Sequence, residues 1–261
     1  MNYGIINKYA IFTEVLMMKK LLILSAACLF LTGCSSSAGG SSSVPENTRV
    51  SVTPIDENII GSWTNGTSGY RFHDDRKVSL LMDYTGVISF GDDFSLNAGD
   101  ISVPAENTLY DGVNYSAMMT GEGEMTEILT MTRTDESTAD PNDISGQYYF
   151  RSGALAQSIV APMGIEPEQA IIIADIDTAA DTFEITLMDY CEFETNDGLL
   201  ELFSPNFHYV DENADSISYT YKIDGDTLTM VYSGSDQTET YQRTEDKPIF
   251  IKDTKTEETT K

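Results

Sequence analysis

The chain has 261 residues and carries 15 basic against 42 acidic side chains, which gives a formal net charge of −27. A surface of this charge repels nucleic-acid phosphates and anionic lipid headgroups, which argues against nucleic acid as a partner and against direct adsorption to a membrane. The chain has three cysteines, Cys28, Cys34 and Cys191, and the first two fall in an N-terminal segment that, as argued below, leaves Cys191 alone and so excludes a cysteine-based metal site.

Residues 1–33 have the features of an export signal. Two lysines, Lys19 and Lys20, precede a short apolar run from Leu21 to Leu31, and small residues follow it. The apolar run is too short to persist as a membrane-spanning helix. We therefore expect this segment to be removed as a signal peptide.

The residues Leu31-Thr32-Gly33-Cys34 resemble a bacterial lipobox. The resemblance implies cleavage before Cys34 and a diacylglyceryl group on its sulfur, and no other cofactor is expected. Two acyl chains hold a protein firmly at a bilayer, whereas one chain binds weakly. The resemblance thus predicts a lipid-anchored protein on the extracytoplasmic face of the cell membrane. Cys191 would then be the remaining free cysteine, and its strand-like surroundings predict a buried thiol rather than a nucleophile.

The segment that follows the lipobox, 34–57, is rich in serine and glycine. Such a composition cannot form a packed core, so that we expect a flexible tether between the lipid and the folded part. The last segment, 251–261, is polar and unpatterned. It is expected to be a disordered tail.

Between the tether and the tail, apolar residues alternate with polar ones. Tyr70 and Phe72 show this pattern, and the stretches 78–82 and 217–223 extend it. Period-two alternation predicts antiparallel strands with one buried face, and the Asp224-Gly225 pair is the strongest hairpin signal in the chain. These patterns predict an all-β fold.

An insert at 151–180 interrupts the run of strands. A short helix is expected to start after Ser152 and to stop before Pro162, and the segment AIIIADI at 170–176 has the β-branched content of a strand. The insert is either a lid at the mouth of a barrel or a packed helix that seals its bottom.

A repeated frame runs through the β-rich part of the chain. Each copy opens on a glycine two residues before an aromatic residue and closes on Arg-Thr followed by two acids. The frame residues are Gly61, Trp63 and Arg133 in the first copy and Gly146, Tyr148 and Arg243 in the second. Agreement in order with differing internal lengths is typical of duplicated β modules.

The tetrapeptide LMDY, at 81–84 and again at 187–190, is weaker evidence for a duplication. Alignment of its two copies sets Leu187 against Leu81, which points to the opposite face from Leu80. A shift of one residue exchanges the core and solvent faces of a strand. We therefore regard this match as coincidental in detail.

The frame, with Gly61, Trp63 and the late segment KIDGDTLTM at 222–230, resembles the lipocalin-like β modules of small lipoproteins of Gram-positive bacteria. The sequence departs from that pattern at Arg76, where a turn glycine is usual, and at Tyr148, which replaces tryptophan. The resemblance implies two tandem lipocalin-like antiparallel barrels or sandwiches. The chain would then consist of a signal peptide (1–33), a tether (34–57), a first module (58–138), a second module (143–250) with its insert (151–180), and a tail (251–261).

In lipocalins a late arginine covers the tryptophan of the Gly-x-Trp strand, through cation–π contact at one end of the barrel. Two tandem modules predict Arg133 over Trp63 and Arg243 over Tyr148. One larger barrel predicts Arg243 over Trp63 instead. In both cases the six frame residues would close barrels and would not be catalytic.

Candidates for chemistry are few. The two histidines, His73 and His208, lie far apart in the sequence, and no motif of a known hydrolase or nucleotide-binding family is present. Asp175, Asp177 and Asp181 are oxygen ligands of the kind that calcium prefers. Because the glycine and the glutamate of an EF-hand loop are missing, a solvated loop is favoured over a metal site.

The sequence therefore predicts a lipid-anchored, extracytoplasmic binding or protein-interaction protein that is not an enzyme. Its partner would be an unknown small molecule or a protein of the cell envelope. The alternative is an extracellular hydrolase that acts on glycan or peptide, which requires a cleft where a histidine or two carboxylates converge. A solute receptor of a transporter is disfavoured, because those proteins alternate strands with helices.

Overall fold

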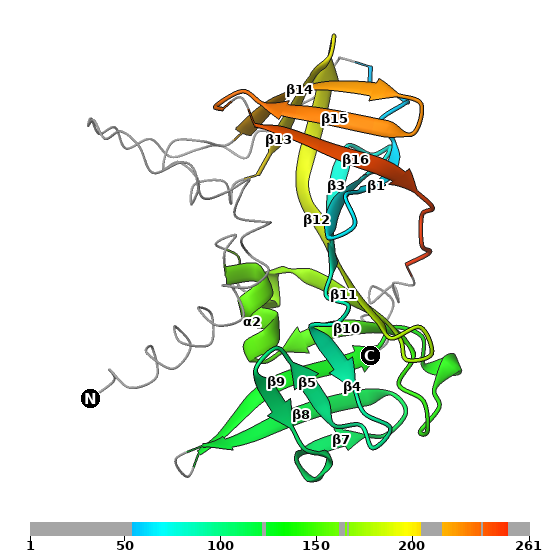
Figure 1. Ribbon diagram of the computed structural model, residues 1–261, viewed down its shortest axis with the longest axis vertical. Coiled ribbons are helices and arrows are strands. Elements are labelled where there is room, and N and C mark those ends of the chain that lie inside the picture. The colour runs from blue at the N-terminus through cyan, green and yellow to red at the C-terminus, as the bar shows by residue number, and fades with distance from the viewer. Residues whose placement is uncertain are drawn as a thin grey trace, which may run out of the picture.

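The computed structural model describes residues 54–121, 124–161, 165, 167–204, 216–235 and 237–249. Its described part is all-β, as predicted, with antiparallel strands and one helix, and forms two units that lie one above the other in Figure 1. The predicted signal peptide, Cys34, the N-terminal part of the tether and the tail at 251–261 lie outside the described residues.

The upper unit is a closed barrel of eight antiparallel strands (Figure 1). Neighbouring strands pair in the order β12-β13-β14-β15-β16-β1-β2-β3, and β3 pairs with β12 to close the ring. The strands are β1 (Gly61–Thr64), β2 (Ser68–Phe72), β3 (Lys77–Asp83), β12 (Thr182–Asn196), β13 (Leu199–Phe203), β14 (Ser216–Asp224), β15 (Thr227–Tyr232) and β16 (Thr238–Thr244).

The lower unit, which we call the inserted unit, is formed by the chain between β3 and β12. Five of its strands, β11 to β7, extend the barrel sheet outward from β12, and the other three make a small separate sheet. The strands are β4 (Ile88–Phe90), β5 (Leu96–Ala98), β6 (Ile101–Val103), β7 (Thr108–Tyr110), β8 (Asn114–Gly121), β9 (Glu124–Arg133), β10 (Gly146–Ser152) and β11 (Ile171–Asp177). Short 3-10 turns lie at Ala105–Asn107, Glu136–Thr138 and Pro167–Gln169.

Helix α2 (Ala154–Val160) falls where the sequence predicted a helix, and β11 follows as expected. Five of its side chains are buried, among them Leu155 and Ile159, and the helix packs against β9 and β10. The insert therefore contributes a packed helix to the core of the inserted unit, rather than a lid. The hairpin at Asp224-Gly225 is also confirmed, since it joins β14 to β15 with Gly225 at a φ of 59°.

Each unit has its own apolar core, but β3 and β12 contribute to both. On β3, Val78 packs in the barrel, while Leu80 and Met82 pack in the inserted unit. On β12, Phe193 packs in the barrel and Ile185 in the inserted unit. Two continuous strands therefore hold the units together.

The two LMDY segments belong to these two strands, which are direct neighbours. Leu80 pairs with Leu187 and Leu81 with Thr186, so that the two copies are offset along this antiparallel strand pair and do not lie opposite each other. Both copies therefore belong to one sheet and do not occupy equivalent positions in two modules. The register shifts between Leu187 and Cys191, where Asp189 adopts a φ of 49°.

The tandem arrangement of modules is not confirmed. The barrel takes β1–β3 from the first predicted module and β12–β16 from the second. The inserted unit takes β4–β9 from the first and β10–β11 from the second. Each predicted module is thus divided between the two units, an arrangement that we call strand-exchanged.

Candidate functional site

The six frame residues form two arginine–aromatic contacts, one in each unit. In the barrel, Trp63 on β1 lies directly opposite Arg243 on β16, and the guanidinium carbon stands 4.1 Å from the centre of the indole. Arg243 also donates hydrogen bonds to the carbonyl oxygens of Ile60 (2.8 Å) and Asn58 (2.5 Å). Trp63 is fully buried and donates from Nε1 to the carbonyl of Ile59 at 2.7 Å. The contact joins the first strand of the barrel to its last strand.

In the inserted unit, Tyr148 on β10 lies opposite Arg133 on β9, with the guanidinium carbon 4.9 Å from the ring centre. Arg133 is only 4% exposed. It donates to the carbonyl oxygens of Gly112 (3.1 Å), Ser145 (2.9 Å) and Asp143 (3.1 Å). Bonds to neutral carbonyls satisfy this buried cation without a carboxylate partner.

These contacts correct the pairing predicted for tandem modules, because Arg133 covers Tyr148 and not Trp63, and Arg243 covers Trp63 and not Tyr148. The geometry also explains the frame glycines. A Cβ at Gly61 would lie 2.9 Å from Nη1 of Arg243, and a Cβ at Gly146 would lie 2.2 Å from Nη1 of Arg133. Each glycine makes room for the arginine, so that all six residues have a structural role.

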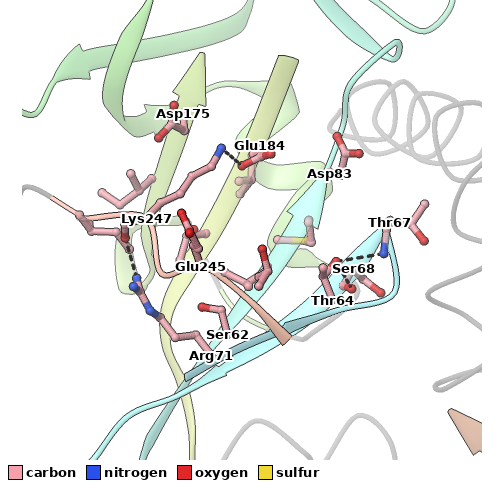
Figure 2. Close-up of a pocket in the computed structure, with 18 of the residues that line it drawn as sticks. Ser62, Thr64, Thr67, Ser68, Arg71, Asp83, Asp175, Glu184, Glu245 and Lys247 are labelled. Atoms are coloured by element: carbon pink, nitrogen blue, oxygen red, sulfur yellow. Dashed lines mark hydrogen bonds and ion pairs between the residues drawn. The ribbon is translucent and has the colours of Figure 1, made fainter. Parts of the chain in front are cut away.

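A cleft of about 250 Å³ with a mixed polar and apolar lining lies on the outer face of the sheet, where the barrel meets the inserted unit (Figure 2). Its floor comes from β1–β3 and β10–β12, and the segment 244–249 after β16 borders it. Hydroxyl side chains line part of it: Ser62, Thr64, Thr67, Ser68 and Thr186. Its apolar floor includes Leu81 and Ile173, which both pair with Thr186 on the strand between them.

Three carboxylates stand in a row across the cleft. Asp83 on β3 is opposite Glu184 on β12, and Glu184 is in turn opposite Asp175 on β11. Gln147 on β10 continues the row and donates from Nε2 to Asp175 at 3.0 Å. Directly opposite residues have Cβ atoms about 4.5–5.5 Å apart, so that the three negative charges are close neighbours.

The segment 245–249, which we call the strap, is held over this sheet by polar contacts to both units. Arg71 on β2 forms an ion pair with Asp246 at 3.3 Å and donates to the carbonyl oxygen of Lys247 at 3.0 Å. Gln147 donates to the carbonyl oxygen of Pro248 at 2.7 Å. Burial alone would raise the pKa of Asp246, but hydrogen bonds from Ser62 and the charge of Arg71 hold it below its ordinary value.

Lys247 reaches from the strap to the carboxylate row, and Figure 2 shows its side chain extending between Glu184 and Asp175. Its Nζ lies 2.5 Å from Oε2 of Glu184. Burial alone would lower the pKa of Lys247, but the hydrogen bond to Glu184 and the charges of Glu184 and Asp175 raise it above its ordinary value.

Of the predicted calcium ligands, Asp175 lies in the cleft, Asp177 is the last residue of β11, and Asp181 lies in the turn that follows. Asp177 accepts hydrogen bonds from the amides of Ala179 and Ala180, and Asp181 adopts a φ of 54°. Within the described ranges, no group of three or more histidine, cysteine or acidic side chains is arranged to hold a metal ion.

The remaining reactive side chains lie away from the cleft. His73 bonds to the hydroxyl of Ser79 at 2.9 Å, but Ser79 is fully buried and no substrate could reach it. Burial lowers the pKa of His73. Cys191 is a buried free thiol whose pKa is raised by burial, as the sequence predicted for an unreactive cysteine. His208 is outside the described residues.

Sequence reasoning missed the cleft. Asp83, Glu184 and Lys247 occupy ordinary outward positions on strands or beyond them, and the chain has 42 acidic residues among which these do not stand out. The available signal was the alternation of side chains at 79–83 and 184–188, in which every second residue faces away from the core. That alternation identifies an outward face but does not say which strands share it.

Comparison of the chain with protein-family models, with curated proteins and with solved structures found no match. Over the part of the chain that the structure describes, no helix is both long and apolar enough to cross a bilayer.

Proposed function

We propose that the protein is an extracytoplasmic binding protein that is anchored by lipid at Cys34 and binds a small polar ligand in the cleft. The cleft is the observation that carries the proposal, since ligand sites are concave and combine apolar surface with a few converging polar groups. Its volume of about 250 Å³ is slightly below the range of roughly 300–1,000 Å³ that suits drug-sized ligands, which favours a small ligand.

The strap supports the same proposal. Its ion pairs involve partly exposed side chains, since Asp246 is 50% exposed and Lys247 is 56% exposed. Exposed ion pairs contribute about 0–1 kcal/mol each, so that the pair of Lys247 with Glu184 can open at low cost when a ligand enters. The anchor rests on the lipobox alone, and it predicts that Cys34→Ser transfers the protein from the membrane fraction to the medium.

Ligand binding is tested by the melting temperature of the protein with a panel of small amines, amino acids, sugars and carboxylates. We expect one class to raise the melting temperature of the wild type, because a ligand that binds only the folded state stabilises it. Thr186→Phe fills the cleft and should abolish the rise. Thr220→Phe, at an exposed position on β14 away from the cleft, should not. A panel in which no class separates the two variants would contradict the proposal.

A hydrolase of glycan or peptide is a second candidate, which one observation favours. Glycosidases use a pair of carboxylates at the reacting bond, and the cleft holds carboxylates on directly opposite strand positions. This candidate predicts release of sugars or peptides from cell-wall material by the wild type and its loss in Glu184→Gln. Equal release by both proteins, or none by either, would dismiss it.

A further inference from the structure

The carboxylate row is an unfavourable arrangement for a surface sheet. Like charges on directly opposite strand positions repel, and here the repulsion occurs twice, between Asp83 and Glu184 and between Glu184 and Asp175. Asp83 receives one hydrogen bond, from the amide of Thr85 at 2.8 Å. Proteins break such local rules mainly where a function requires it.

Lys247 compensates only part of this charge. It pairs with Glu184, whereas the other nearby cation, Arg71, is engaged with Asp246. Lys247 belongs to the strap and not to the sheet, and both its side chain (56% exposed) and that of Glu184 (39% exposed) are accessible to solvent. A pair of this kind can exchange with a competing cation from solution.

The shape of the row favours an organic cation over a metal ion. Calcium requires six to eight oxygen ligands that converge on one point, whereas these carboxylates are spread along a line across three strands. An ammonium group donates three hydrogen bonds and needs no closed ligand sphere. The apolar floor at Leu81 and Ile173, one pleat away, suits a methylene chain.

We propose that the cleft binds an alkylammonium group, supplied by a small aliphatic diamine or by the lysine side chain of a peptide, and that Lys247 competes with it for Glu184. This inference rests on the proposed function, because it names the ligand class of the same cleft. Lys247 is itself an alkylammonium, so the pair with Glu184 shows how such a group is held.

Calorimetric titration of the full lipidated chain in detergent tests the proposal. The probes are 1,4-diaminobutane, a tripeptide with a central lysine, and the neutral isostere 1,4-butanediol. We expect at least one of the two amines to bind and the diol not to bind. The double change Asp175→Asn and Glu184→Gln should weaken amine binding at least tenfold. The double variant also removes the repulsion between the two carboxylates, so its melting temperature should not fall. A loss of binding in this variant can then not be ascribed to unfolding.

Lys247→Met separates competition from simple charge attraction. Removal of the competing ammonium should increase the affinity for the amine roughly tenfold, and by more than the removal of a lysine away from the cleft does. The matched control is Lys222→Met, which removes an exposed lysine on β14 that pairs only loosely with Asp224, at 4.0 Å. Equal affinities in Lys247→Met and Lys222→Met would overturn the role of Lys247.

Binding of the diamine alone identifies a free small amine as the source, and binding of the tripeptide alone identifies a lysine side chain. If neither amine binds while another class stabilises the protein through the cleft, the amine inference fails and the binding function stands. Calcium binding that depends on Glu184 would also overturn the inference. If no class binds, both proposals fail.

Discussion

The barrel and the inserted unit contain the same arginine–aromatic contact, but solvent reaches the two contacts to different extents. In both, a glycine-x-aromatic strand lies beside an arginine that stacks on the aromatic ring. The side chain of Arg243 is 32% exposed and has Asp226 at 3.9 Å, whereas Arg133 is 4% exposed and is held by three carbonyl oxygens and the hydroxyl of Tyr110 at 2.9 Å.

The difference shows that one sequence frame can support two physical roles. In the barrel the arginine covers one end of the core and stays in contact with solvent. In the inserted unit it connects the loops at 112 and 143–145, because it donates hydrogen bonds to carbonyl oxygens in both. Burial, rather than the ring contact, should therefore decide how much each arginine stabilises the protein.

The largest effect is expected from the arginines themselves. Arg133→Met removes the hydrogen bonds to the carbonyl oxygens of Gly112, Ser145 and Asp143 and leaves a cavity for the lost guanidinium, and it should lower the free energy of unfolding by about 3–5 kcal/mol. Arg243→Met should cost about 1–2 kcal/mol, since water can replace its bonds. Urea unfolding measures both. Arg151→Met is the control, because Arg151 stacks on Tyr149 at 4.3 Å but is exposed, and should cost at most about 1 kcal/mol. Equal costs at 133 and 243 would refute the distinction.

The frame glycines sharpen the comparison. Gly146→Ala should destabilise the protein by about 3 kcal/mol, because the new methyl group meets a guanidinium that three carbonyls hold in place. Gly61→Ala should cost less, since Arg243 can shift toward solvent. Gly66→Ala provides the reference: its φ is 92° but a Cβ would meet nothing within 4 Å, so that it carries only the backbone strain of about 1–2 kcal/mol. In thermal unfolding, Gly146→Ala should therefore lower the melting temperature most, Gly61→Ala less and Gly66→Ala least. A larger loss in Gly61→Ala than in Gly146→Ala would contradict the comparison.

The smallest effect concerns the strap, which joins the two units from outside. The folded-state pKa of Asp246 lies below its ordinary value of 3.8, so that its contribution is fully present above pH 3.8 and is lost as the pH falls through the folded-state pKa. The loss should be less than about 1 kcal/mol. In NMR spectra, the Nε–H resonance of Arg71 should broaden as the pH falls through the folded-state pKa of Asp246. In Asp246→Asn, this resonance should not change over the same pH range. An unchanged resonance in acid would show that the ion pair does not hold the strap.

Local sequence was sufficient for the elements but not for their assembly. Alternation predicted the strands, the β-branched run predicted β11, and Asp224-Gly225 predicted its hairpin. The frame also predicted that an arginine stacks on the aromatic residue, and of the two pairings considered, only Arg243 over Trp63 is found. Which arginine stacks on which ring depends on which strands pair. Trp63 and Arg243 lie on paired strands that are more than a hundred residues apart in the sequence, and local patterns carry no information on such pairing.

The cleft could not be predicted for the same reason. Asp83 and Glu184 are separated by about a hundred residues and become neighbours only through the register of β3 and β12. Asp175 was singled out as a calcium ligand because of its neighbours in sequence, Asp177 and Asp181. Its neighbours in space are Glu184 and Gln147, on adjacent strands.

Cross-linking tests the strand-exchanged architecture most directly. Thr64 pairs with Gln242, and Tyr149 pairs with Thr132. Cysteines at these two pairs, each in a chain that begins at Ser35 and carries Cys191→Ala, should oxidise to disulfides, since opposite Cα atoms lie within bridging range. Tandem modules would instead bring together the pairs 64 with 132 and 149 with 242. Disulfides in the first two pairs and free thiols in the last two are the predicted result, and the reverse pattern would contradict the account.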